Sequence, residues 1–95
     1  MKAGDRYFVR IDRKTGGHKV DAKTLSAHME HIRKFAAQAE LYGGGFAGIP
    51  GGMLIFRADS FAAAVSFCKN DPVISGGFYR YELLEWELLV APAER

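Results

Sequence analysis

Two histidines and one aspartate are the residues whose types and spacing could support acid/base chemistry. His28 and His31 lie three positions apart in a segment with helical periodicity, so their side chains reach neighbouring parts of one helix surface. Asp71 precedes Pro72, whose ring stiffens the backbone at that point and would hold the carboxylate in place. A carboxylate that positions an imidazole by hydrogen bonding gives a general acid/base pair. The sequence by itself leaves open whether Asp71 meets either histidine.

Each of these side chains also has a purely structural interpretation, and pattern alone favours it. His28 shares the apolar stripe of its helix and would be partly buried, whereas His31 lies at the edge of that stripe and would be exposed. Asp71 would be a turn or capping residue. A metal site would need a further ligand nearby, which neither the loop residue His18 nor Cys68, the single cysteine, clearly supplies. We therefore expect neither a metal nor a cofactor.

Two other motifs resemble binding sites but have simpler explanations. The run Gly43–Gly48 lacks the preceding strand, the following helix and the Lys-Ser/Thr ending of a phosphate-binding loop, so it indicates close approach of backbones. Aromatic residues alternate with Arg80 between Phe78 and Tyr81, as on an RNA-stacking surface, but a net charge of +2 offers little attraction for phosphate. Cys68 is expected to be a buried thiol and not a nucleophile. We expect no nucleic-acid partner.

Length and composition predict one folded domain. The 95 residues are 48% hydrophobic and 25% charged, which is typical of soluble globular domains. No apolar run approaches the ~20 residues of a membrane span, and the N-terminus lacks the apolar core of a signal peptide. We therefore expect a single domain over residues 1–95 with a tail from about residue 91, located in the cytoplasm and without a membrane partner.

Hydrophobic periodicity predicts the elements that position the two histidines. Apolar residues alternate over residues 6–12, which indicates a strand, and a polar, glycine-punctuated loop follows over residues 13–20. An amphipathic helix begins after Asp21, which serves as its N-cap. The glycines 43–45 supply its stop, because they accommodate a left-handed C-terminal residue.

The rest of the chain is predicted to contain three strands and a second helix. Residues 43–56 suggest a glycine-rich strand, a turn and a buried strand. A short helix begins after Ser60 and ends before Pro72. A long strand covers residues 78–90, and its apolar pattern changes phase at residues 83–84, which predicts a bulge or burial of both faces.

The predicted order is strand, helix, strand, strand, helix, strand. This is the α+β, ferredoxin-like βαββαβ sandwich. Its two helices cover one face of the sheet only, while apolar and aromatic residues are within reach of both faces. We therefore expect the uncovered face to pair with a second copy, as a homodimer.

Three blocks of the sequence carry a family resemblance. The first runs from His31 to Phe35 and leads toward Ala47-Gly48, and the second is the strand at residues 53–56 with the capped helix that follows. The third and most specific is residues 71–78, in which Asp-Pro is followed by a glycine five residues beyond the proline. Together they resemble the YCII-related family of small dimeric α+β barrel proteins.

The resemblance implies a His–Asp pair in a pocket beside the barrel, acting on a small organic substrate by lyase- or isomerase-type acid/base chemistry without a cofactor. Asp71 matches the acid position. An ungapped count back from Ala47-Gly48 selects His31 as the family histidine, with His28 as the second choice. An anionic or phenolic substrate would be bound by Arg10, Arg33, Tyr79 and Ser75. The alternative function is a non-catalytic module of the same fold that binds a small ligand or a partner.

Overall fold

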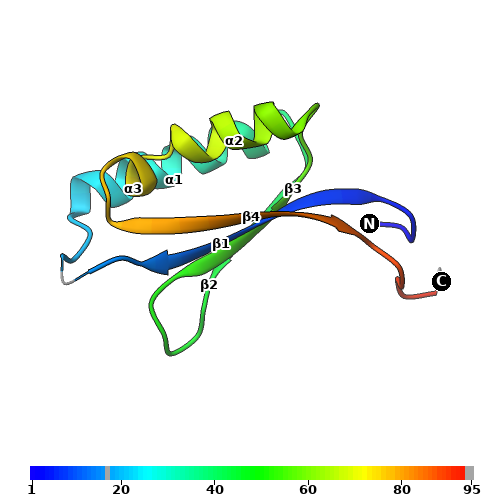
Figure 1. Ribbon diagram of the computed structural model, residues 1–95, viewed down its shortest axis with the longest axis horizontal. Coiled ribbons are helices and arrows are strands. Elements are labelled where there is room, and N and C mark those ends of the chain that lie inside the picture. Colours follow the sequence, from blue (N-terminus) through cyan, green and yellow to red (C-terminus); the bar gives the residue numbers. More distant parts are fainter. Residues whose placement is uncertain (17, 94–95) are drawn as a thin grey trace.

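The computed structural model describes residues 1–16 and 18–93, and in this part of the chain four antiparallel strands form one sheet with the helices on one face (Figure 1). The elements are β1 (Arg6–Lys14), α1 (Ala22–Ala36), β2 (Leu41–Gly45), β3 (Gly52–Phe56), α2 (Phe61–Lys69), α3 (Pro72–Ser75) and β4 (Tyr79–Glu87). The strands lie in the order β2-β3-β1-β4. The predicted α+β, ferredoxin-like order is therefore confirmed, with the short α3 added before the last strand.

Helix α1 begins where predicted but ends earlier. The carboxylate of Asp21 accepts a hydrogen bond from the Thr24 amide at 2.7 Å and caps the first turn. The helix ends at Ala36 and is followed by a right-handed cap residue, so the prediction that the glycine run stops it is wrong. That run forms β2, where a Cβ on Gly43 would lie only 2.6 Å from Cδ2 of Leu54 in β3. A side chain at Gly43 would have to displace Leu54, so glycine lets β2 and β3 pack closely here.

The second half contains two further differences from the predictions. Helix α2 starts as expected, with the Ser60 hydroxyl accepting from the Ala63 amide at 3.0 Å. Asp71, predicted as a turn or capping residue, caps the short helix α3, and this helix itself was not predicted. The described pairing of β4 with β1 runs without interruption through Leu83 and Leu84, so no bulge is present there. The phase change arises because Leu83 packs against the core, whereas Leu84 lies on the opposite face.

The two faces of the sheet have different surroundings. The face toward the helices packs into the core, whose buried residues are Ile32, Leu54, Phe56, Ala64, Phe67 and Cys68. In the described part of the chain the other face carries no helix (Figure 1). Strand register places four large apolar side chains on it, each 38–49% exposed: Tyr42, Met53, Leu84 and Trp86.

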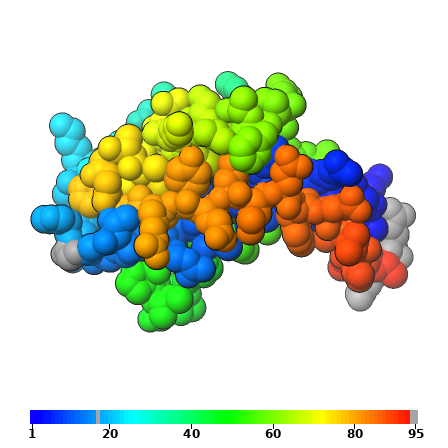
Figure 2. Space-filling model, in the orientation of Figure 1, coloured from blue at the N-terminus to red at the C-terminus, as the bar shows by residue number. Residues whose placement is uncertain are grey.

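The space-filling view shows how the layers are arranged at the surface. Figure 2 shows the helical layer above β4, and the turn between β2 and β3 projecting from the side of the sheet away from the helices. Within residues 1–16 and 18–93, no helix is long and apolar enough to cross a membrane.

Candidate active site

Asp71 is held rigidly at the start of α3. Its backbone is extended, with φ −72° and ψ 126°, because Pro72 excludes the helical region for the residue before it. Proline in the first turn and a capping aspartate are both favourable at a helix N-terminus. Oδ1 of Asp71 accepts a hydrogen bond from the Val73 amide at 3.1 Å. The side chain is completely buried, so its remaining hydrogen-bonding capacity must be satisfied inside the protein.

Arg10, at the centre of β1, supplies one of the hydrogen-bond donors that Asp71 requires. Its Nη2 donates to Oδ2 of Asp71 at 2.8 Å, while Nε and Nη2 donate to the two carboxylate oxygens of Asp12 at 2.7 and 2.8 Å. Positions 10 and 12 share one face of the strand, which lies under the helices, so the fork of the guanidinium can join both carboxylates. Nη1 of Arg10 is buried and has no hydrogen-bond partner among the described residues.

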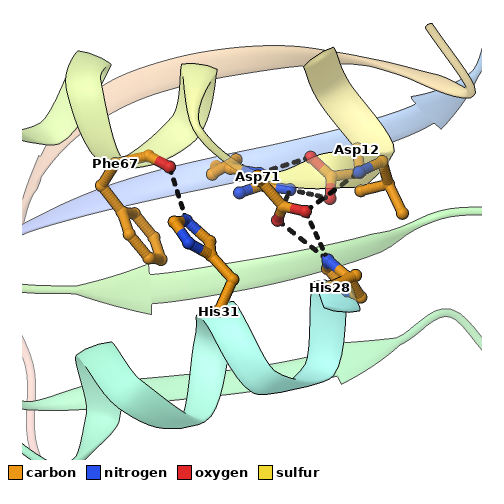
Figure 3. A network of polar contacts seen from close by, with 7 residues as sticks. Asp12, His28, His31, Phe67 and Asp71 are labelled. Atoms are coloured by element: carbon orange, nitrogen blue, oxygen red, sulfur yellow. Dashed lines mark hydrogen bonds and ion pairs between the residues drawn. The ribbon is translucent and has the colours of Figure 1, made fainter. Parts of the chain in front are cut away.

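His28 completes the cluster from α1 (Figure 3). Its Nδ1 lies 2.8 Å from each carboxylate oxygen of Asp71, and its side chain is 18% exposed. Because an ionised carboxylate can only accept, Nδ1 carries the hydrogen. In the neutral ring the lone pair is then on Nε2, which is the atom available to take a proton.

His31 points to a different partner (Figure 3). Its Nε2 lies 2.8 Å from the carbonyl oxygen of Phe67 and its ring stacks on that phenylalanine, with ring centroids 4.9 Å apart. This contact joins α1 to α2. Of the two histidines the structure therefore brings His28 to Asp71, and the preference for His31 as the partner is wrong. The two side chains leave α1 in different directions, and only the position of α3 decides which one meets the carboxylate.

The electrostatics of the cluster keep Asp71 ionised. Burial raises the pKa of Asp71, but hydrogen bonding from His28 and the charge of Arg10 lower it by more, so that the pKa lies below the usual range. Burial lowers the pKa of Arg10, whereas the hydrogen bonds and charge of Asp12, together with Asp71, raise it by more. One guanidinium and two carboxylates leave one net negative charge beside His28.

A cavity of about 580 Å³ opens beside His28 and Asp12. Its wall is formed by α1, by strands β2 and β3 with the turn between them, and by the loop before α1. Apolar side chains and backbone dominate it, and the polar or titratable side chains that reach it are those of Asp12, Lys14, Lys19, His28 and Tyr79. His28, whose Nε2 has no hydrogen-bond partner among the described residues, thus lies at the side of a mostly apolar pocket, as polar groups in ligand sites commonly do.

The four residues predicted to bind substrate separate into three groups. Tyr79 lines the cavity. Arg10 lies beneath its wall, completely buried, where the carboxylates and not a ligand occupy its Nε and Nη2 groups. Arg33 and Ser75 are exposed and do not line the cavity. Neither the local pattern around Arg33 nor that around Ser75 contained information about the cavity, which forms only when distant segments meet.

Sequence reasoning missed Lys14 and Lys19, because both were assigned to a polar loop. The signal for Lys14 was present: it continues the alternation of Arg10 and Asp12 on one face of β1, which extends two residues beyond its predicted end. No equivalent signal marks Lys19, because the loop carries it to the cavity.

Other chemistry-bearing side chains contribute no additional centre. Among the described residues, no three His, Cys, Asp or Glu side chains come together as a possible metal site. Cys68 is completely buried, and burial raises the pKa of its thiol to about 11. His18 is exposed and does not line the cavity.

Comparison with known proteins agrees with the architecture. Residues 6–87 match the YCII-related domain. The chain belongs to this family. The resemblance inferred from the three sequence blocks is thus confirmed, since the match covers all three of them.

Among solved structures, the YCII-family chain is similar to 5-chloro-2-hydroxyhydroquinone dehydrochlorinase from Burkholderia phenoliruptrix, determined in complex with 2,5-dihydroxybenzoquinone. The TM-score is 0.70 at 22% sequence identity, and the match covers 85% of this chain and 93% of the other. At this identity the similarity establishes a shared fold and nothing more. A comparison with curated protein sequences found no match.

Proposed function

We propose that this YCII-family protein is an enzyme that moves a proton on a small organic substrate held in the cavity, without a cofactor. His28 is the general base and acid, and Asp71 is the residue that positions it. The observation that carries the proposal is the 2.8 Å contact between Nδ1 of His28 and the buried, ionised Asp71, which leaves Nε2 free beside a cavity of about 580 Å³.

The proton balance of the reaction follows from this arrangement. Nε2 of His28 takes a proton from an acidic C–H or O–H group of the substrate, and the ring becomes an imidazolium next to the Asp71 carboxylate. The electron pair left on the substrate either shifts and is reprotonated by His28 at another atom, or expels a leaving group. The first outcome is an isomerisation. The second is an elimination, after which His28 returns its proton to solvent.

Arg10 and Asp12 act as positioning residues in this scheme. Arg10 keeps the Asp71 carboxylate ionised and fixes the direction of its oxygens, so that Nδ1 of His28 always carries the hydrogen. Asp12 in turn holds the guanidinium through two short hydrogen bonds. His31 has no catalytic role in this proposal, because its Nε2 is engaged by the carbonyl of Phe67.

The dehydrochlorinase of the same fold gives this proposal a first substrate class to test. Its name describes loss of hydrogen chloride from a chlorinated trihydroxybenzene, which is an elimination, and its bound molecule is a small quinone. The likeness to this chain lies in the fold, so the reaction and the substrate enter here as a proposal only.

We also propose that the protein works as a homodimer in the cytoplasm. The uncovered sheet face carries Tyr42, Met53, Leu84 and Trp86 in exposed positions, and a second copy laid on the same face would bury them. The free thiol of Cys68 suits a reducing compartment.

The function is tested by incubating the protein with 5-chloro-2-hydroxyhydroquinone, and with small ketones and phenols in D₂O, and following chloride release or deuterium incorporation by NMR. His28→Gln should lower kcat/KM on any turned-over probe by about 10²–10⁴-fold, because the base is lost. Asp71→Asn should lower it by a similar factor, while its amide can still cap α3. His31→Gln is the matched control on the same helix and should change kcat/KM less than about threefold.

Full activity in His28→Gln would refute the proposal. If the wild-type protein turns over no probe, yet binds one and retains that binding after Asp71→Asn, the non-catalytic ligand-binding module becomes the better assignment.

A further inference from the structure

The charges that line the cavity carry information about its ligand. Lys14 and Lys19 are both exposed, both line the cavity and form no ion pair within the described part of the chain. Asp12 also lines it, but both of its oxygens accept hydrogen bonds from Arg10 and the residue is only 8% exposed. The acidic group of the cavity is therefore already engaged, whereas the two cations are free.

The charge balance of the site is positive even when the ion cluster is included. Arg10, Asp12 and Asp71 together contribute one net negative charge, and the two lysines contribute two positive charges. The balance becomes more positive when His28 takes a proton. Tyr79, which pairs with Lys14 across β1 and β4, also lines the cavity and offers a neutral O–H donor.

The rest of the wall is apolar or has no side chain. From α1, Leu25 is 50% exposed and Met29 37% exposed, and both line the cavity. On the opposite wall Gly45 faces the cavity, and a Cβ there would meet only the Gly51 carbonyl oxygen, at 3.8 Å. Exposed apolar side chains on one wall and open space on the other suit a flat, apolar body between them.

From these observations we propose that the ligand of this site is a small organic anion with an apolar, ring-sized body, whose negatively charged oxygens are bound by Lys14 and Lys19. This inference rests on the proposed function, because it concerns the same cavity. It adds a chemical role for the lysines: the charge that develops on a substrate oxygen when His28 removes a proton lies where two cations can stabilise it.

Binding of matched anion and amide pairs tests the ligand class without requiring turnover. Benzoate and benzamide, and phenylacetate and phenylacetamide, have nearly the same shape but differ in charge. They are titrated at neutral pH and low salt against ¹⁵N-labelled protein, and the amide signals of cavity residues such as Gly45 and Val73 are followed. Each carboxylate should bind about tenfold more tightly than its amide.

Variants of the lysines assign this preference to the cavity. In Lys14→Met/Lys19→Met the preference should fall to less than about twofold, because the stems are kept and only the charges are removed. Lys34→Met is the matched control: Lys34 is exposed on α1, pairs with Glu30 at 3.6 Å and does not line the cavity. Its preference should equal that of the wild type.

A steric pair of variants locates the apolar body. Gly45→Val should weaken binding of carboxylate and amide alike, because it fills the open wall without changing charge. Gly16→Ala is the control, since Gly16 is exposed, does not line the cavity, and a Cβ there would have no heavy atom within 4 Å.

Three results would overturn the ligand class: amides that bind as tightly as carboxylates, a preference that survives in the double lysine variant, or no binding of either carboxylate at millimolar concentration. These results are separate from failure of the proposed function. If His28→Gln loses turnover while amides and carboxylates bind equally, the enzyme assignment is retained and the anionic ligand is rejected. Full turnover in His28→Gln, together with a preference for anions that depends on the lysines, would reject His28 as the catalytic base and retain the anionic ligand.

Discussion

Strand β1 differs from its neighbours in how its two faces divide polar and apolar residues, because the covered face of the adjacent strands is apolar, with Leu54, Phe56 and Leu83 on it. On β1 the face covered by helices carries Arg10 and Asp12, both buried, whereas the uncovered face carries Tyr7, Val9 and Ile11. An antiparallel sheet with one solvated face normally turns its apolar residues toward the core. At β1 the buried charges lie on the covered side, where we propose the chemistry takes place, and the apolar residues lie on the side that we propose pairs with a second copy.

The faces also differ in how they are stabilised. A buried ion cluster is favourable only while every member has its partners, so its residues depend on one another. An apolar face gains free energy roughly in proportion to the area that it buries, and no single contact is indispensable. Substitutions on the two faces should therefore fail in different ways.

The largest effect is expected on the covered face. Arg10→Met should lower the free energy of unfolding by about 3–5 kcal/mol, because it leaves Asp12 and Asp71 buried without their cation. Arg6→Met is the matched control on the same strand: its pair with Glu87 is 3.4 Å long and exposed, so the loss should stay below about 1 kcal/mol. Urea unfolding measures both variants. Equal losses would mean that the cluster has no special importance for stability.

On the uncovered face, Trp86→Glu should convert a dimer into a monomer while the fold is kept. A charge placed on the apolar face would weaken association by about 2–4 kcal/mol. Light scattering after size-exclusion chromatography measures the mass, and circular dichroism checks the fold. Leu89→Glu is the control, because Leu89 is 74% exposed and lies beyond the end of β4. A wild-type monomer at micromolar concentration would contradict the assembly role of this face.

Acid should destabilise the covered face selectively. Because the pKa of Asp71 is lower in the folded protein than in the unfolded chain, its ionised form stabilises the fold above the unfolded value of about 4. That contribution, about 1–3 kcal/mol, is lost as the pH falls through the folded pKa. Unfolding in urea across this range should show the decline in the wild type and a flatter curve in Asp71→Asn. The exposed Asp59→Asn is the control, and a decline unchanged in Asp71→Asn would contradict the prediction.

The smallest effect concerns Cys68, which lies in the covered core. Cys68→Ala, which removes the sulfur and leaves only the Cβ methyl group, should cost about 1 kcal/mol, because the void is small and alanine favours the helix. Since burial raises the pKa to about 11, the neutral thiol stabilises the fold below its unfolded pKa, and this stabilisation disappears as the pH rises through about 11. Iodoacetamide should therefore label the unfolded chain but not the folded one at neutral pH. Rapid labelling of folded protein would show that the site opens.

Elements with local signals could be predicted from the sequence. Asp21 and Ser60 cap their helices through side-chain bonds to amides three residues ahead, so the information lies within one turn. The alternation of β1 was visible for the same reason. The glycine run was different, because glycine permits both a helix stop and a close strand contact, and only the presence of Leu54 across β2 and β3 decides between them.

The candidate site was predictable in composition but not in pairing. Asp71 and both helix histidines were found from residue type and spacing, since proline after aspartate and a three-residue step on a helix are local features. The choice of His28 could not be made, because it depends on where α3 places Asp71 relative to α1. Arg10 was found as well, but as a ligand-binding residue, and its burial between two carboxylates arises only after β1 is covered by helices.

By itself, the sequence determined the order of strands and helices, the caps, the family and the set of groups available for acid/base chemistry. These properties depend on interactions between residues a few positions apart or on their identities alone. The tertiary structure decided which histidine meets Asp71, that Arg10 serves the carboxylates, and that Lys14 and Lys19 face the cavity. The contacts of Asp71 with His28 and Arg10 join residues 43 and 61 positions apart, and burial sets their strength, since the same charges would interact weakly in water.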